Sequence, residues 1–270
     1  MLTTDRIEII PVPGIVEQVR RHLPAGSGVS VTALPSHAIS DTVATALALA
    51  DAGFDPIPHL ASARIDGHRQ LDAIVSRLSD SPMTELFVIG GDGPVADGAF
   101  PDGAALLSAL RDKAGDRFRL GVAAYPEGHP AFGVGAGLEI LRAKAAEADH
   151  AVTQMCFDGA VVGAFVRQVA AEGIRLPLWL GVPGQVSTTQ LLKISARIGV
   201  GPSLAFARKG SNRRLLARYD SVALRRAVLA GLGESASSVA GFHVFSFNAL
   251  DRLDSRDDAR ARAGAGGSPP

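Results

Sequence analysis

Residues 119–158, RLGVAAYPEGHPAFGVGAGLEILRAKAAEADHAVTQMCFD, decide the fold. The apolar residues of 118–125 and of 150–157 predict two strands, and the helical spacing of 137–148 predicts a helix between them. We interpret GVGAG at 133–137 as a flexible loop that leads into this helix. A strand, a helix and a second strand in this order are the unit from which parallel sheets are built.

The same pattern recurs along the chain. Further strands are expected at 7–12, 28–34, 56–62, 84–92, 176–183 and 242–248. Helices are expected at roughly 14–23, 41–53, 66–78, 103–113, 159–172, 187–199 and 214–232, with a charged helix at 250–263. These elements predict an α/β fold, a single (β/α)8 TIM barrel over residues 1–263, with an extra helical segment before strand eight. We expect residues 264–270 to form a disordered tail.

Polar residues lie within or at the ends of the expected strands. They are Glu8, Thr32, His59, Asp92, Tyr125, Gln154 and Asn248. In a closed barrel the carboxyl ends of all strands meet at one mouth, where barrel enzymes carry their active sites. In an open doubly wound sheet the same residues would spread along an edge. Their distribution therefore favours the barrel.

Bulk composition narrows the choice of partner and compartment. Lys plus Arg and Asp plus Glu both number 27, so charge gives no reason to expect nucleic acid as a partner. The single Cys excludes an intramolecular disulfide and a multi-Cys metal site. We find no signal peptide and no apolar stretch long enough for a membrane helix. The expectation is a soluble, cytoplasmic protein that is a monomer or a small homo-oligomer.

Three of the polar residues, Glu8, Asp92 and His59, have a structural interpretation beside the functional one. Glu8 inside a barrel would be partly desolvated and would suit a general acid, but it could also face solvent or an ion-pair partner. Asp92 follows two glycines, where Asp commonly caps a turn. His59 could be a hydrogen-bonded core histidine. The carboxamide of Gln154 can both donate to and accept from a heterocycle.

The loop after the strand at 118–125 is harder to explain as structure alone. Tyr125, Glu127 and His129 stand close together, and Pro126 and Pro130 stiffen the segment that carries them. A stiff loop holds side chains in place without a large ordering cost when a ligand binds. We therefore predict that this loop forms one wall of a pocket.

Several segments together resemble the methylenetetrahydrofolate reductase family. They are IEIIP at 7–11, VSVT at 29–32, PHL at 58–60, GDGP at 91–94, GVAAYPEGHP at 121–130, Lys144 and VTQMCFD at 152–158. The family is a (β/α)8 barrel, in agreement with the fold expected above. The resemblance implies reduction of 5,10-methylenetetrahydrofolate to 5-methyltetrahydrofolate, with folate and a nicotinamide cofactor as partners.

The resemblance also implies roles for individual residues. Glu8 matches the family's acid, which promotes opening of the methylene bridge, and Asp92 matches the Asp that hydrogen-bonds the pterin. Gln154 matches the Gln that contacts folate and the reduced nicotinamide, and Tyr125 is expected beside the substrate as well. The expected cofactor-binding residues are Thr32, His59, Tyr125, Glu127, His129 and Lys144.

The chain departs from the family pattern where the flavin is bound. Family members place an Asp, an Asn and an Arg on the helix before Lys144, and the corresponding residues here are Gly137, Ile140 and Ala143. A diphosphate or ribityl chain without these partners would bind poorly. We therefore expect NADH or NADPH to donate hydride directly to the folate, without FAD.

Three alternatives stay open from the sequence. The chain could be a tetrahydrofolate-dependent methyltransferase or demethylase, a non-catalytic folate-binding protein, or a reductase that keeps FAD through other contacts. A basic cluster, Arg208, Lys209, Arg213 and Arg214, could meet a phosphate or a polyglutamate tail, or could form a solvated face.

Overall fold

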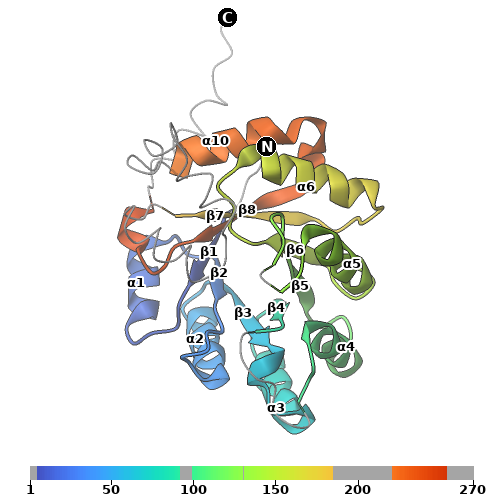
Figure 1. Ribbon diagram of the computed structural model, residues 1–270. Coiled ribbons are helices and arrows are strands. Elements are labelled where there is room, and N and C mark those ends of the chain that lie inside the picture. Colours follow the sequence, from blue (N-terminus) through green and yellow to red (C-terminus); the bar gives the residue numbers. More distant parts are fainter. Residues whose placement is uncertain (1–4, 92–98, 130, 185–220, 254–270) are drawn as a thin grey trace, which may run out of the picture.

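Eight parallel strands close into a barrel in the order β1-β2-β3-β4-β5-β6-β7-β8 (Figure 1). The computed structural model describes residues 5–91, 99–129, 131–184 and 221–253. The strands are β1 (Asp5–Ile9), β2 (Gly28–Val31), β3 (Asp55–Ala61), β4 (Glu85–Ile89), β5 (Arg119–Ala124), β6 (His150–Thr153), β7 (Leu178–Pro183) and β8 (Val239–Phe245). The predicted (β/α)8 barrel is confirmed.

Helices surround the barrel on its outer side (Figure 1). They are α1 (Ile15–His22), α2 (Ile39–Asp51), α3 (His68–Ser79), α4 (Gly103–Ala114), α5 (Val134–Lys144), α6 (Gly159–Ala171) and α10 (Ser221–Leu232). Short 3-10 turns cover Ser62–Arg64, Gly233–Ser238 and Leu250–Arg252. The helix expected at 187–199, most of the one expected at 250–263 and the tail lie outside the described residues.

The barrel sorts its apolar side chains into two groups. Outward-facing strand residues such as Ile9 and Val31 pack with the helices in the larger core. A smaller cluster, Ile57, Phe87, Val152 and Trp179, fills the inside of the barrel. Because side chains alternate along a strand, the strand residues between the outward-facing ones are directed to the barrel interior. That interior carries the polar residues of the site.

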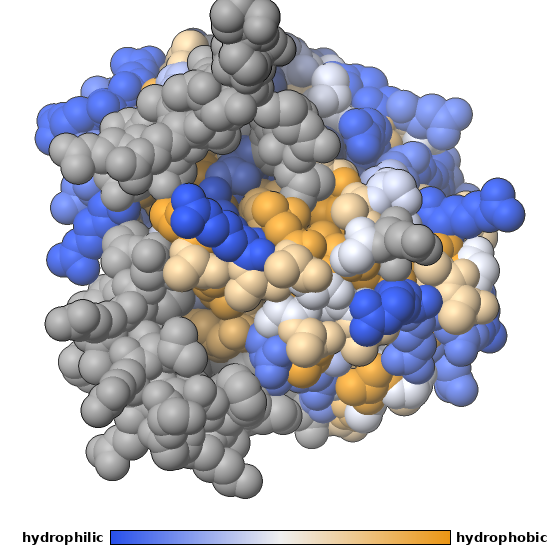
Figure 2. Space-filling view, turned by 90° about the horizontal axis from the view of Figure 1, so that it is seen from above, coloured by the Kyte–Doolittle hydropathy of each residue, from blue (hydrophilic) through white to orange (hydrophobic). Residues whose placement is uncertain are grey.

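Helix α10 packs closely against α6 through glycines. A Cβ atom built on Gly163 of α6 would overlap the carbonyl oxygen of Gly231 on α10. Gly159 approaches the backbone of α10 in the same way. Figure 2 views the molecule from this side, and apolar residues gather near its centre among hydrophilic ones. Leu229 of α10 is 41% exposed.

The structure corrects three predicted boundaries. The segment at 133–137 is not a flexible loop, because α5 begins at Val134 and the Gly137 N–H donates to the Gly133 carbonyl at 3.0 Å. Strand β6 ends at Thr153 rather than at 157, since Asp158 turns the chain into α6 by accepting from the Ala160 N–H at 2.8 Å.

The third correction concerns strand eight, which was expected at 242–248. β8 ends at Phe245. Phe247 and Asn248 beyond it have φ angles of 50° and 62°, in the left-handed region that no strand residue adopts. The chain therefore turns sharply after β8, and Asn248 lies in this turn.

Candidate active site

Glu8 on β1 lies inside the barrel against two histidines. Its Oε2 is 3.0 Å from Nε2 of His243 on β8 and 3.8 Å from Nε2 of His59 on β3. Its side chain is only 14% exposed. Within the described part of the chain, these histidines are its only ion-pair neighbours, and no Lys or Arg pairs with it. Of the two structural alternatives for Glu8, the solvent-facing carboxylate is wrong, whereas a pairing neighbour, His243, is present.

His59 is a neutral ring in this arrangement. Burial lowers its pKa to about 4, against an opposing effect of the Glu8 charge and a further lowering by His243. Its Nε2 lies 2.7 Å from the hydroxyl oxygen of Ser30 on β2, and its ring packs on Phe87 with centroids 4.7 Å apart. His59 therefore contributes a fixed polar wall beside Glu8 rather than a charge.

The turn after β8 holds the end of β1 that carries Glu8. The Ser246 hydroxyl donates to the Glu8 carbonyl oxygen. The Asn248 carboxamide pairs with both main-chain groups of Ile10, accepting from its N–H and donating to its carbonyl oxygen. Three residues of one segment thus contact either Glu8 or Ile10, which lies two residues further along the chain: His243, Ser246 and Asn248. The main chain around Glu8 is fixed from the β8 side.

The loop after β5 folds into an aromatic cluster. His129 and Phe132 form an isolated antiparallel bridge, and their rings stack with centroids 4.6 Å apart. The ring of Tyr125 meets His129 edge-on at 5.0 Å and Phe132 at 5.6 Å. Glu127 is half-buried in the same loop. The structure therefore brings together the three residues that the sequence singled out in this loop.

Gln154 and Thr32 supply further hydrogen-bonding groups at the carboxyl ends of their strands. Gln154 directly follows β6, and its Oε1 accepts from the Met155 N–H at 2.9 Å. Thr32 directly follows β2, and its hydroxyl is buried without a hydrogen-bond partner among the described residues. An unsatisfied buried hydroxyl is costly unless a ligand or water meets it. In a closed parallel barrel both lie at the same end as Glu8.

Lys144 is set apart from this group. Its Nζ lies against the first residue of α4, so a Cβ on Gly103 would be 3.4 Å from it. Burial lowers the pKa of Lys144, and the carboxylate of Asp102, which caps α4, opposes that shift. Asp92 and the basic cluster at 208–214 lie outside the described residues. Their expected roles stay predictions.

A second polar cluster lies inside the barrel at the amino ends of the strands. Arg6 donates to Glu85 at 2.9 Å, lies 3.0 Å from Nε2 of His150, and stacks over the ring of Trp179. Burial acts to raise the pKa of Glu85, but the His150 hydrogen bond and the Arg6 charge outweigh it and lower that pKa. Gly121 leaves space for the His150 ring. This cluster therefore fills the barrel interior at the end opposite the mouth.

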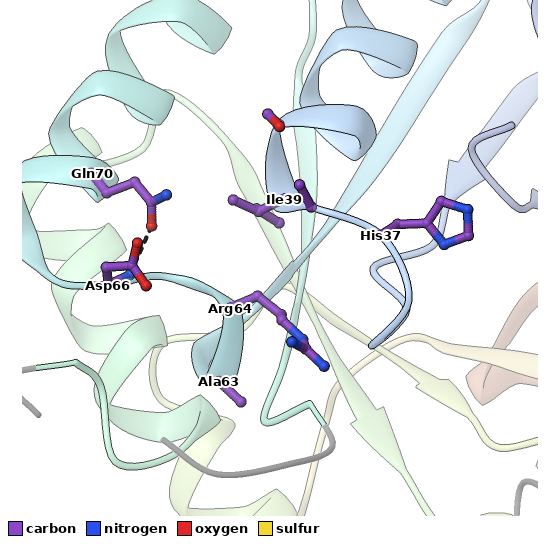
Figure 3. Close-up of a pocket in the computed structure, with 8 residues that line it drawn as sticks. His37, Ile39, Ala63, Arg64, Asp66 and Gln70 are labelled. Atoms are coloured by element: carbon purple, nitrogen blue, oxygen red, sulfur yellow. Dashed lines mark hydrogen bonds between the residues drawn. The ribbon is translucent and has the colours of Figure 1, made fainter. Parts of the chain in front are cut away.

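A surface pocket opens between the loops that follow β2 and β3. It measures about 270 Å³ and is lined by His37, Ile39, Arg64, Asp66 and Gln70, among others (Figure 3). Figure 3 shows the Arg64 side chain pointing away from Asp66 and Gln70, while His37 points away from the other side chains. The Asp66 N–H donates to Gln70 Oε1 at 2.7 Å. Glu8 is not among the residues that line this pocket.

Two absences hold for the described residues. No group of three His, Cys, Asp or Glu side chains there is arranged to hold a metal ion. No helix among them has the length and apolar character to cross a membrane. Cys156 is a free cysteine and is fully buried.

His243 is the residue of the site that the sequence interpretation missed. The signal was present in FHVF, because Phe242 and Val244 belong to the outer core and the residue between them must face the barrel interior. Its contact with Glu8 depends on the register between β1 and β8, which no local pattern reveals.

Comparisons with known proteins agree with this geometry. A family model described as methylenetetrahydrofolate reductase matches residues 12–201. Methylenetetrahydrofolate reductase 1 of Schizosaccharomyces pombe is 32% identical over 121 residues, which cover 42% of this chain and 20% of that protein. Methylenetetrahydrofolate reductase 2 of Saccharomyces cerevisiae is 30% identical over 158 residues, which cover 54% of this chain and 26% of that protein. The chain therefore spans about a quarter or less of these relatives' length.

Solved structures share the fold at low identity. A GH18 chitinase from Pseudoalteromonas aurantia superposes with a TM-score of 0.57 and 13% identity, covering 96% of this chain and 99% of that one. A phosphonopyruvate hydrolase superposes with a TM-score of 0.51 and 13% identity, covering 98% and 84%. At this identity the likeness concerns the barrel alone.

Proposed function

Because this chain belongs to the methylenetetrahydrofolate reductase family, we propose that it reduces 5,10-methylenetetrahydrofolate to 5-methyltetrahydrofolate with hydride from NADH or NADPH. The observation that carries the proposal is the Glu8 carboxyl group, held inside the barrel by His243 and next to His59. A carboxyl group in a largely enclosed site, with no Lys or Arg paired to it among the described residues, is suited to proton transfer.

Glu8 acts as the general acid in this proposal. The methylene carbon of the substrate bridges N5 and N10 of the folate. The protonated Glu8 carboxyl gives its proton to N10, the bond between N10 and the methylene carbon breaks, and the electron pair stays on N10. The carbon is left as an iminium on N5, which accepts a hydride. The Glu8 carboxylate regains a proton from solvent before the next turnover.

The opposite wall of the mouth binds the folate. β6 lies three strands from β1 around the closed ring, so Gln154 at the carboxyl end of β6 stands on a different part of the mouth from Glu8. Its carboxamide can hydrogen-bond the pterin, and Tyr125 beside it offers an aromatic face and a hydroxyl. Asp92 is assigned to the pterin through the family resemblance.

The nicotinamide cofactor, whose reduced ring supplies the hydride, fits polar groups around the same mouth. The buried Thr32 hydroxyl lacks a partner among the described residues and can accept the carboxamide N–H. We assign His59, Tyr125, Glu127 and His129 to the walls that exclude water from the stacked rings. Lys144, the last residue of α5, whose Nζ lies beside the start of α4, is assigned to a cofactor phosphate.

The residues on α5 do not fit a flavin. Gly137 is buried against the Phe132 ring, while Ile140 is 37% exposed and Ala143 is exposed, so none of the three positions offers a polar side chain. A diphosphate or ribityl chain laid along this helix would lose hydrogen bonds to water without replacement. We therefore propose direct hydride transfer to the folate iminium, and no step passes through FAD.

The proposal extends to the setting of the enzyme. Without a membrane-spanning helix among the described residues, we propose a cytoplasmic enzyme of one-carbon metabolism, acting in the supply of methyl groups for methionine biosynthesis. Its partners are then small molecules rather than nucleic acid, and it is a monomer or a small homo-oligomer.

The test combines one spectrum and one assay on the purified protein. The visible absorption spectrum should lack a flavin band, and incubation with NADH or NADPH and 5,10-methylenetetrahydrofolate should oxidise the cofactor and yield 5-methyltetrahydrofolate in equal amounts. A flavin band that is bleached by NADH would overturn the flavin-free route. Methyl transfer to or from folate without cofactor oxidation would replace the reductase by a methyltransferase.

A further inference from the structure

The histidine beside Glu8 has no assigned role, and its geometry suggests one. His243 is buried, 1% exposed, and its Nε2 lies at hydrogen-bond distance from Glu8 Oε2, at 3.0 Å. Nδ1 of the same ring is buried and has no hydrogen-bond partner among the described residues. Placing a proton on Nδ1 would bury an N–H group without an acceptor. This places a ring proton on Nε2, the nitrogen that faces the Glu8 oxygen.

We propose that His243 is a positioning residue, which selects the oxygen of Glu8 that carries the acidic proton. This inference rests on the acid role of Glu8 proposed above. Since the Nε2–H donates to Oε2, that oxygen stays an acceptor when the carboxyl group is protonated, and the proton occupies Oε1. When the proton passes to the substrate nitrogen, the O–H bond breaks and its electron pair remains on the carboxylate. The His243 N–H then stabilises the new negative charge through Oε2.

His59, the other histidine beside Glu8, cannot donate a hydrogen bond to Oε2 in the same way. His59 Nε2 is 3.8 Å from Oε2, beyond a hydrogen bond, and it already contacts the Ser30 hydroxyl at 2.7 Å. The turn after β8 adds a second constraint, since Ser246 bonds the Glu8 carbonyl oxygen and Asn248 bonds Ile10. Both the side chain and the main chain of Glu8 are thus held by one segment, with two residues at positive φ. Strained backbone of this kind persists where the surrounding structure fixes it.

The deciding experiment is a double-mutant cycle on turnover. His243→Leu keeps the bulk of the ring but removes the donor, whereas His243→Gln keeps an N–H at nearly the same place. We expect His243→Leu to lower kcat by roughly tenfold to a hundredfold, less than the roughly 10²–10⁴-fold contribution of a general acid itself, with KM for folate changed less. His243→Gln should recover most of that loss.

Measuring the effect of His243→Leu in enzyme that already carries Glu8→Gln separates a positioning role of His243 from a structural one. If His243 acts through Glu8, then His243→Leu causes no further loss in Glu8→Gln enzyme. An equal loss in both backgrounds would overturn the inference, as would His243→Leu enzyme with wild-type kcat. Melting temperatures of all variants show which of them are folded, and His243→Gln provides the folded case if the Leu variant is not.

A second readout does not depend on turnover. The ring nitrogen signals of His243, read by NMR in the intact protein, should report a proton on Nε2, and Glu8→Gln should shift the Nε2 signal. A proton on Nδ1, or signals unchanged by Glu8→Gln, would overturn the pairing. Wild-type protein that turns over no folate with either cofactor would instead contradict the proposed function, so the two failures are distinguishable.

Discussion

The carboxamide of Asn248 forms two hydrogen bonds with the main chain of Ile10, two residues beyond Glu8. Its Oδ1 accepts from the Ile10 N–H at 2.8 Å, and its Nδ2 donates to the Ile10 carbonyl oxygen at 3.0 Å. Asn248 does this from a φ of 62°, which Asn tolerates better than most residues. This pair joins the end of β8 to the end of β1, where the barrel closes, and it sets where Glu8 stands.

Two substitutions of Asn248 should separate the contribution of its hydrogen bonds to stability from the contribution of its positive φ angle. Asn248→Ala loses two hydrogen bonds and places Ala at positive φ, so we expect the free energy of unfolding to fall by about 2–3 kcal/mol. Asn248→Gly also loses both hydrogen bonds, but Gly adopts a positive φ without strain. Its free energy of unfolding should therefore fall by only about 1–2 kcal/mol. Urea unfolding measures both values. Variants as stable as the wild type would show that the pair does not hold β1.

Removing the acid should slow turnover without unfolding the protein. Glu8→Gln keeps the size of the side chain and loses the transferable proton, so we expect kcat to fall by roughly 10²–10⁴-fold. Binding of folate, followed by fluorescence quenching, should change little. Glu17→Gln on the exposed face of α1 is the matched control and should leave kcat unchanged. Retention of full kcat by Glu8→Gln would exclude Glu8 as the acid.

Acid should destabilise the protein through His59. In the unfolded chain His59 takes up a proton near its ordinary pKa of 6.5, but burial lowers that pKa to about 4 in the folded protein. Between these values the unfolded state binds more protons, so the free energy of unfolding decreases as the pH falls from 6.5 toward 4. The full loss from this residue is about 3 kcal/mol.

Urea unfolding of the wild type and of His59→Gln at pH 7 and pH 4.5 tests this. The variant lacks the titrating ring and should lose less stability between the two pH values. Parallel losses in the two proteins would assign the acid sensitivity to other groups.

The contact between α6 and α10 depends on glycine. Gly163→Ala adds a methyl group that overlaps the Gly231 carbonyl oxygen. We expect a net destabilisation of about 1–3 kcal/mol from overpacking, even though Ala is the better helix former. Gly135→Ala on α5 is the control, because its Cβ would meet no atom within 4 Å. Thermal unfolding should show a lower Tm for the first variant only, and equal Tm values would contradict this packing.

Much of the barrel follows from local pattern. Runs such as LFVI at 86–89 in β4 are apolar because both faces of a parallel strand are covered, and the helices between the strands show regular spacing. The same pattern predicted α5 but could not place its start, because glycines at 133–137 favour loops in isolation and form a helical turn here. Tertiary packing decides such segments.

The candidate site was predictable where one segment carries it. Tyr125 and His129 are close in sequence, and the structure brings their rings together. Glu8 was visible as a carboxylate within an apolar strand. Its partner His243 is more than two hundred residues away, and only the closure of β8 onto β1 brings them into contact. Contacts of that kind depend on topology and register rather than on local sequence.

Direct hydride transfer from the nicotinamide cofactor to the folate is tested most directly by deuterium labelling. The protein is incubated in ordinary water with 5,10-methylenetetrahydrofolate and nicotinamide cofactor carrying deuterium at the transferred position of C4, and the product methyl group is analysed by mass spectrometry. Direct transfer predicts one deuterium in each methyl group formed. A flavin intermediate would hold the hydrogen on a nitrogen that exchanges with water, so methyl groups formed at full yield without deuterium would contradict the account.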